Sequence, residues 1–155
     1  MSHLFCLHPN TVESNFHRLQ PLLEKLVAQF PDGTYSVGGI LGKFARQDWT
    51  CWTINKENDL DSDIIAVVGT TCFPDMSQTP TMQIVFATGE NPGVIMDVLD
   101  EFHKTASENG LRKIEIIGRA GWTPALKEMG YDTSLRLYRK EIEPPLVDMT
   151  IEGNA

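Results

Sequence analysis

The spacing of apolar residues predicts helices in the first third of the chain. Apolar positions recur there three or four residues apart, which is typical of a helix with one buried face. We expect one helical segment over 11–30, with Thr11 as its N-cap and a kink or restart at Pro21. A second short helix is predicted over 36–44, and a weakly alternating run at 3–7 predicts a short strand before both.

Three runs rich in apolar and β-branched residues follow, separated by polar or proline-containing segments. They cover 49–55, 63–73 and 82–88. The second and third are continuously apolar over their central part, which favours strands that are covered on both faces of a sheet. Because they follow one another with short connections, we expect an antiparallel meander.

A helical period returns after the third run. It predicts a helix over 93–109, which begins at an Asn-Pro-Gly segment and ends at Gly110. A further strand is expected over 112–118. The strand 82–88, the helix and the strand 112–118 then form a crossover, so these two strands should be parallel.

The end of the chain predicts one more helix and strand. Thr123 and the proline after it open a short helix that Gly130 closes, and 131–142 alternates like a strand. The predicted fold class is therefore α+β, with a mixed central sheet flanked by helices. We expect one domain over 1–142 and a C-terminal arm over 143–155.

Composition excludes several classes of protein. The chain has 155 residues, 13 basic and 21 acidic side chains and a net charge of −8, which suits one globular domain and argues against nonspecific nucleic-acid binding. Neither a membrane-spanning apolar run nor a secretory signal is expected. The three cysteines, Cys6, Cys51 and Cys72, are interpreted as reduced, buried thiols, and the predicted location is the cytoplasm.

Charge is unevenly distributed along the sequence. Residues 48–101 carry ten acids and one base, whereas residues 112–140 carry seven bases and three acids. Such a split is compatible with solvated surface, and equally with a complementary interface that orients a partner.

The C-terminal third carries motifs that resemble a known family. The segments are Gly118-Arg119-Ala120-Gly121-Trp122, Gly130-Tyr131 and Leu137-Tyr138-Arg139-Lys140. Together with the predicted order β-α-α-β-β-β-α-β-α-β, they make residues 5–142 resemble the GNAT (acyl-CoA N-acyltransferase) fold. The Gly-Arg-x-Gly-Trp segment and the strand at Trp49–Ile54 are most similar to a divergent branch encoded by tailed bacteriophages.

The resemblance implies an acetyl-CoA site where the helix after the fourth strand begins. The candidate cofactor-binding residues there are Gly89, Asn91 and Gly93. The family's Gln/Arg-x-x-Gly-x-Gly/Ala loop is not restored, because Glu90 stands where glutamine or arginine belongs and Pro92 has no N–H. A plain helix cap is the other interpretation. We therefore expect no cofactor, or acetyl-CoA if the chain is an enzyme.

The family's catalytic tyrosine is also missing. Its position, counted back from the Gly-Tyr pair, holds Leu126, which cannot donate a proton. Tyr131, Tyr138 and Glu115 are substitutes that each have a plain structural explanation, so no catalytic residue is assigned. The aspartates of Asp59-x-Asp61-x-Asp63 lack the rest of a calcium loop, and no metal site is predicted.

Arg119, Gly121 and Trp122 are the candidate partner-binding residues, since arginine and tryptophan are favoured interface anchors. The alternative is that Trp122 packs on the sheet and Arg119 pairs with an acid. The predicted function is a non-catalytic binding or virion-associated structural component that contacts a protein partner or a phage assembly. The alternative function is an acetyl-CoA-dependent N-acetyltransferase acting on an unknown amine.

Overall fold

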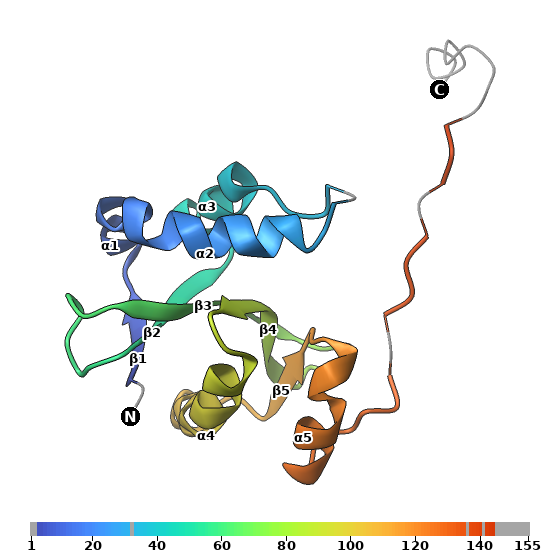
Figure 1. Cartoon of the computed structure of the whole chain (residues 1–155). Helices are drawn as coiled ribbons and strands as arrows, with labels where there is room; N and C mark the ends of the chain where they lie inside the picture. Colours follow the sequence, from blue (N-terminus) through green and yellow to red (C-terminus); the bar gives the residue numbers. More distant parts are fainter. Residues whose placement is uncertain (1–2, 32, 136, 141, 145–155) are drawn as a thin grey trace. The chain divides into compact units, whose positions relative to one another are not determined.

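A computed structural model of the chain describes residues 3–31, 33–135, 137–140 and 142–144. The chain forms two compact units, Met1–Ala120 and Gly121–Ala155, which are described separately. The first unit holds the sheet and most of the helices (Figure 1).

The first unit is built on one five-stranded mixed sheet with the order β1-β2-β3-β4-β5. The first four strands pair antiparallel, and β4 and β5 pair parallel, which confirms the predicted meander, crossover and α+β class. The strands are β1 (His3–Leu7), β2 (Thr50–Asn55), β3 (Ile64–Pro74), β4 (Pro80–Gly89) and β5 (Lys113–Ile116).

Three helices precede β2, namely α1 (Pro9–Ser14), α2 (Phe16–Ala28) and α3 (Val37–Ala45). The predicted restart at Pro21 is wrong, because Pro21 lies inside α2 and the helical segment is interrupted at Asn15 instead. Asn15 leaves the helical conformation with φ −109° and ψ 14°, and its Nδ2 donates to the carbonyl of Thr11 over 2.9 Å. The N-cap of α1 is His8 and not Thr11, since Pro9 already occupies the first turn.

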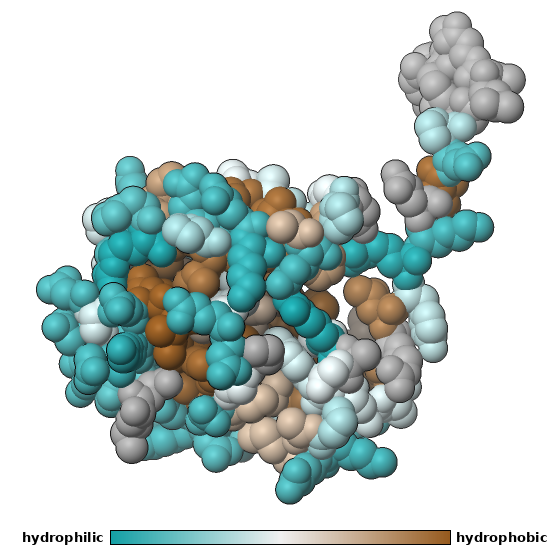
Figure 2. All heavy atoms as spheres, viewed as in Figure 1, coloured by the Kyte–Doolittle hydropathy of each residue, from teal (hydrophilic) through white to brown (hydrophobic). Residues whose placement is uncertain are grey.

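The helices α1–α3 and one face of the sheet share a hydrophobic core. Figure 2 shows apolar atoms between the hydrophilic outer surface of the helices and the sheet. Leu19, Leu23 and Ile40 supply helical members of this core, and Val67, Val85 and Phe86 supply strand members. Burial of this apolar stripe is what holds the glycine-rich helix α3 in place.

The helix α4 (Pro92–Glu108) packs against the opposite face. The ring of Phe102 meets Trp52 of β2 edge to face, with centroids 5.2 Å apart. Trp52 Nε1 donates to Thr70 Oγ1 of β3 over 2.9 Å, so the indole is satisfied inside the core. The helix ends before Gly110, whose φ of +76° favours glycine, as predicted.

The second unit contains the short helix α5 (Thr123–Glu128), and the one-turn 3₁₀ helix η1 (Ala120–Trp122) leads into it. Gly130, with a φ of +91°, ends α5 as predicted. The predicted strand 131–142 is wrong, because its described residues belong to no helix or strand. They have no sheet partner there, and Leu135, Leu137 and Tyr138 are 71–86% exposed. Of the predicted arm, 143–144 is likewise irregular and 145–155 lies outside the described residues.

The cysteines are free, but only Cys51 is buried. The prediction of burial is wrong for Cys6 and Cys72, which are exposed. Cys6 lies in the edge strand β1 and alternates with Leu7, so that Leu7 faces the core and Cys6 does not. Among the described residues, no helix has the length and hydropathy needed to cross a membrane.

Candidate functional site

The strand β4 contains a β-bulge at Val85. Gly69 of β3 lies opposite Phe86, and the next residue, Thr70, lies opposite Ile84. Val85 is therefore an extra residue in β4 with no partner in β3. Val85 and Phe86 are consecutive, yet both belong to the core on the α1–α3 side. Two adjacent side chains on one face are the expected result of such an insertion.

The pairing of β4 with β5 stops at this bulge. Ile84 and Ile116 are the last paired residues, and the carbonyl of Ile84 accepts the N–H of Ile117 over 2.9 Å. From Val85 to Gly89, the structure pairs β4 with β3 only. Among the described residues, the second half of β4 therefore has one edge with no paired strand, and this open edge is the candidate site.

The bulge also reverses which backbone groups face that edge. Before it, the carbonyls of Pro80 and Ile84 accept hydrogen bonds on the β5 side. After it, Glu90 N donates to Ile65 of β3, whereas the carbonyl of Gly89 points away from β3. Because backbone direction alternates along a strand beyond the bulge, Ala87 and Gly89 direct their N–H and C=O groups to the open edge.

Two glycines allow close approach at this place. A Cβ on Gly69 would stand 2.3 Å from Cε2 of Phe86, and a Cβ on Gly89 would stand 2.8 Å from the carbonyl oxygen of Ile65. Real Cβ atoms do not approach so closely. The bulge and the end of β4 therefore depend on the absence of a side chain at both positions.

The structure brings Gly89, Asn91 and Gly93 together where β4 passes into α4. Asn91 is the N-cap of α4, and its Oδ1 accepts the N–H of Gly93 over 2.9 Å. The N–H of Val94 donates to the carbonyl of Asn91, and the N–H of Glu90 donates to the carbonyl of Ile65. The helix-cap interpretation of this segment is confirmed. Whether the segment also binds a cofactor stays a prediction.

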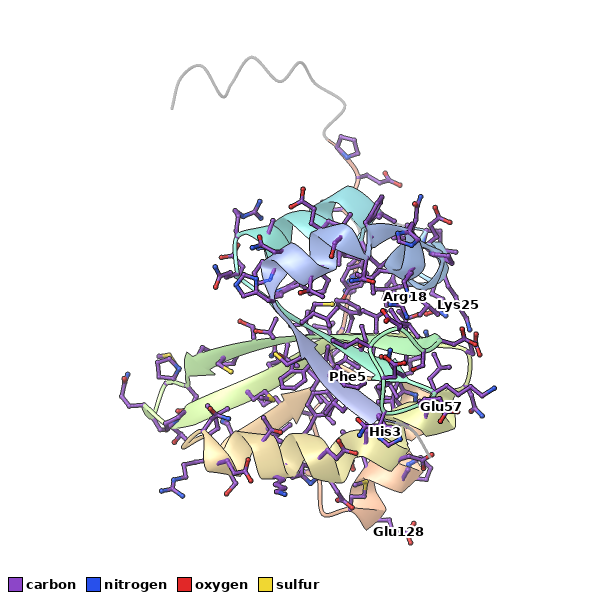
Figure 3. The ribbon with its side chains drawn as sticks, turned by 90° about the vertical axis from the view of Figure 1, so that its left-hand side faces the viewer. His3, Phe5, Arg18, Lys25, Glu57 and Glu128 are labelled. Atoms are coloured by element: carbon purple, nitrogen blue, oxygen red, sulfur yellow. The ribbon has the colours of Figure 1, made fainter. Side chains whose placement is uncertain are left out.

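Lys25 is a residue of the site that the sequence analysis missed. It lies in α2, and its Nζ donates to the carbonyl of Gly89 over 2.6 Å. One turn earlier, the carbonyl of Leu22 accepts Thr88 Oγ1 over 3.3 Å, so α2 lies along the second half of β4. Figure 3 shows Arg18 and Lys25 both reaching from α2 toward the sheet. The only sequence signal was that they are seven residues apart, hence on one helical face.

The other predicted site residues, the partner-binding candidates and the substitute catalysts, are divided between the two units. Arg119 is exposed at the end of the first unit, whereas Gly121 and Trp122 belong to the second, with Trp122 buried. Of the substitute catalysts, Glu115 is half-buried in β5 and Tyr138 is 86% exposed. Within the described residues, no group of three or more His, Cys, Asp or Glu side chains could hold a metal ion.

No protein-family model and no curated protein sequence matches the chain. Solved structures do match its fold. A ribosomal-protein-alanine N-acetyltransferase from Brucella melitensis biovar Abortus 2308 has a TM-score of 0.65 at 12% identity, covering 92% of this chain and all of its own (100%). An aminoglycoside acetyltransferase from an uncultured soil metagenomic sample, in complex with sisomicin, has a TM-score of 0.62 at 10% identity, with 91% and 97% covered.

A third match is a predicted acetyltransferase from Clostridium acetobutylicum, solved with acetyl-CoA. Its TM-score is 0.60 at 17% identity, and the superposition covers 90% of this chain and 96% of the other. At such identities the likeness concerns the fold alone. The chain has the mixed α+β fold of the GNAT acetyltransferases.

Proposed function

We propose that this chain is a GNAT-fold protein that binds a protein partner and transfers no acetyl group. The observation that carries the proposal is the state of the amides at the β4–α4 junction. Glu90 N bonds to Ile65, Pro92 has no N–H, and Gly93 and Val94 donate to Asn91. An anion placed at this helix end would have to displace the cap before it could be held.

Charge at the junction acts in the same direction. The carboxylate of Glu90 is exposed next to the cap, where it would repel a diphosphate. Lys25 is the compensating cation, but its Nζ already donates to the carbonyl of Gly89. Together these contacts support a helix end that is closed to the phosphates of acetyl-CoA.

The residues proposed to bind the partner are Arg119 and Gly121, with the buried Trp122 supporting the segment that carries them. Arg119 and Gly121 are exposed in their respective units, and arginine is a frequent interface anchor. The Gly-Arg-x-Gly-Trp motif supports a further assignment, to the virion-associated proteins of tailed bacteriophages. Mass spectrometry of purified particles of the encoding phage tests it: the chain should be present in stoichiometric amounts, and its absence contradicts the virion role.

The decisive experiment is the thermal unfolding of the full chain with millimolar acetyl-CoA. A ligand present at 100 times its Kd stabilises the native state by about 2.7 kcal/mol, which would raise the Tm by about 5–10 °C in a domain of this size. We expect no shift. A clear shift that Lys25→Glu abolishes and the distant Lys104→Glu leaves intact would overturn the proposal.

One observation favours a second function, an acetyl-CoA-dependent N-acetyltransferase acting on an unknown amine. At the open edge, the backbone of Ala87 has no paired strand among the described residues, so an extended ligand with amide groups could bond there. One structure of this fold was solved with acetyl-CoA. Under this function, acetyl-CoA would raise the Tm, and a panel of amines would release free thiol when incubated with it.

A further inference from the structure

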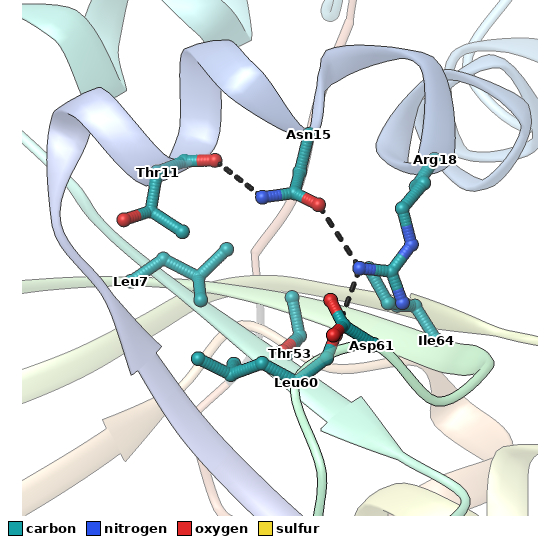
Figure 4. A pocket seen from close by; sticks show the side chains of 8 residues that line it. All are labelled: Leu7, Thr11, Asn15, Arg18, Thr53, Leu60, Asp61 and Ile64. Atoms are coloured by element: carbon teal, nitrogen blue, oxygen red, sulfur yellow. Dashed lines mark hydrogen bonds between the residues drawn. The ribbon is translucent and has the colours of Figure 1, made fainter.

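A cavity of about 190 Å³ lies between the helices α1 and α2 and the sheet, away from the β4–α4 junction (Figure 4). Its walls come from both helices, from β1, β2 and the start of β3, and from the loop that joins β2 to β3. The lining residues are Leu7, Thr11, Asn15, Arg18, Thr53, Leu60, Asp61 and Ile64.

One wall carries a positive charge that no carboxylate neutralises. Arg18 Nη1 donates to Asn15 Oδ1 over 2.9 Å and to the carbonyl of Leu60 over 2.8 Å, and Nη2 donates to the carbonyl of Ser62. In the described part of the chain, no acidic oxygen lies within 4.0 Å of this guanidinium. Of its five N–H groups, these contacts use three.

A negative charge stands on another wall of the same cavity. The carboxylate of Asp61 makes no ion pair in the part of the chain that the structure describes. Beneath it lies Thr53, whose side chain is buried and whose hydroxyl donates to Asn55 Oδ1 over 2.7 Å. Its lone pairs are left to accept a hydrogen bond.

The remaining walls are apolar, formed by Leu7, Leu60 and Ile64. The cavity thus combines a cation, an anion and an aliphatic surface. Arg18 and Asp61 both line it, and they form no ion pair with each other. A volume of about 190 Å³ corresponds to about six water molecules, which is the size of a small aliphatic amino acid.

We infer that this cavity binds a free α-amino acid with a small aliphatic side chain. The carboxylate of the ligand accepts from Arg18, its ammonium donates to Asp61 and Thr53, and its side chain lies against Leu7 and Ile64. A zwitterion matches both charges at once, whereas a simple anion would meet Asp61 and a simple cation would meet Arg18. This inference is independent of the proposed function.

The test is titration of the ¹⁵N-labelled full chain with L-valine, followed by ¹H–¹⁵N correlation spectra. We expect saturable shifts at the amides of Thr53, Asp61 and Ile64. Isovalerate, which lacks the ammonium, and isobutylamine, which lacks the carboxylate, should each bind at least about tenfold more weakly, since each loses a charge-assisted hydrogen bond. Equal binding of either probe, or no saturable shift with L-valine, overturns the inference.

Matched variants locate the site. Asp61→Asn should weaken L-valine binding about tenfold or more, and Thr53→Val should weaken it while keeping the shape of the side chain. Asp63→Asn is the control, because it removes the same charge from the same loop and does not line the cavity. If Asp63→Asn weakens binding as much as Asp61→Asn, the effect is long-range charge and the assignment is wrong.

Discussion

The ring of Phe86 lies where a side chain on Gly69 would have to be. A Cβ at position 69 would stand 2.3 Å from Cε2 and 2.8 Å from Cδ2 of that ring. The two residues face each other across β3 and β4 at the bulge, so the glycine leaves room for the aromatic side chain next to the register shift.

Gly69→Ala should therefore destabilise the protein by about 1–3 kcal/mol, because the ring must move inside a packed core. Urea unfolding measures the loss. The control is Gly38→Ala, since no atom lies within 4 Å of a Cβ at this position of α3 and alanine favours a helix by about 0.5–1 kcal/mol. Equal stability of Gly69→Ala and the native chain would contradict the close packing.

Removal of the α4 cap should be measurable by the same method. Asn91→Ala deletes the acceptor of the Gly93 N–H and should cost about 1 kcal/mol. Asn91→Asp keeps an acceptor at that place and adds a favourable charge at the helix N-terminus, so it should retain stability. A loss of the same size in both variants would show that the cap bond is not the cause.

Arg18 holds the loop between β2 and β3 by donating to the carbonyls of Leu60 and Ser62. Arg18→Met should cost about 2 kcal/mol, as expected for hydrogen bonds to a charged group. Hydrogen exchange should become faster at the amides of Lys56 and Ser62, which bond within the same loop. Arg46→Met, which removes only an exposed contact with Asp48, should change stability by no more than about 1 kcal/mol. Unaltered exchange in Arg18→Met would contradict this role.

The contact between Asp75 and Lys113 should make stability depend on pH at both ends of the range. Lys113 Nζ donates to Asp75 Oδ2 over 2.6 Å, which lowers the pKa of Asp75 and raises the pKa of Lys113. The contribution of Asp75 is present above its unfolded pKa of about 3.9 and is lost as the pH falls through the lower folded pKa. That of Lys113 is present below about pH 10.4 and is lost as the pH rises through the higher folded pKa.

Asp75→Asn tests this contact, because the amide oxygen can still accept from Ser77 and Thr79 while the charge is removed. Urea unfolding midpoints should be lower than those of the native chain at neutral pH, and the difference should vanish toward acid. The control Asp97→Asn removes an exposed charge of α4 and should show no such profile. A pH-independent difference for Asp75→Asn would contradict the ion pair.

The three thiols should react at different rates. Burial, together with the nearby Cys6, raises the pKa of Cys51 to about 12, and desolvation by neighbouring protein atoms raises the pKa of the exposed Cys6 and Cys72. Because the thiolate is the reactive form, iodoacetamide at pH 8 should label Cys6 and Cys72 slowly and Cys51 only after unfolding. Mass spectrometry of native and urea-treated protein counts the adducts, and rapid labelling of native Cys51 would contradict its burial.

Hydrophobic periodicity predicted most of the first unit, because the side chains that alternate or recur there are the ones that are buried. It predicted the meander and the crossover correctly, and the Asn-Pro-Gly segment and Gly110 predicted the two ends of α4. It failed at Asn15, where a polar side chain bonds back to Thr11 and interrupts the helix without changing the apolar stripe. It failed again at 131–142, where an alternating sequence has no sheet partner among the described residues.

The candidate site was only half predictable. Gly89, Asn91 and Gly93 follow a strand and open a helix, and such a position can be recognised from local residues. Lys25 could not be found this way, because its contact with Gly89 joins residues 64 positions apart. The open edge was hidden as well, since Val85 is one more apolar residue in an apolar run and nothing in the sequence marks it as unpaired.

The bulge at Val85 inserts one residue at the point where the pairing of β4 with β5 ends. Ile84 is paired with Thr70 on the α4 side, and Phe86 is in the core on the other side, so removal of Val85 would leave both side chains on their present faces. The strand would then regain a regular backbone, and β5 could continue alongside it. A deletion of this one buried valine is therefore expected to let the pairing of β4 with β5 extend past Ile84.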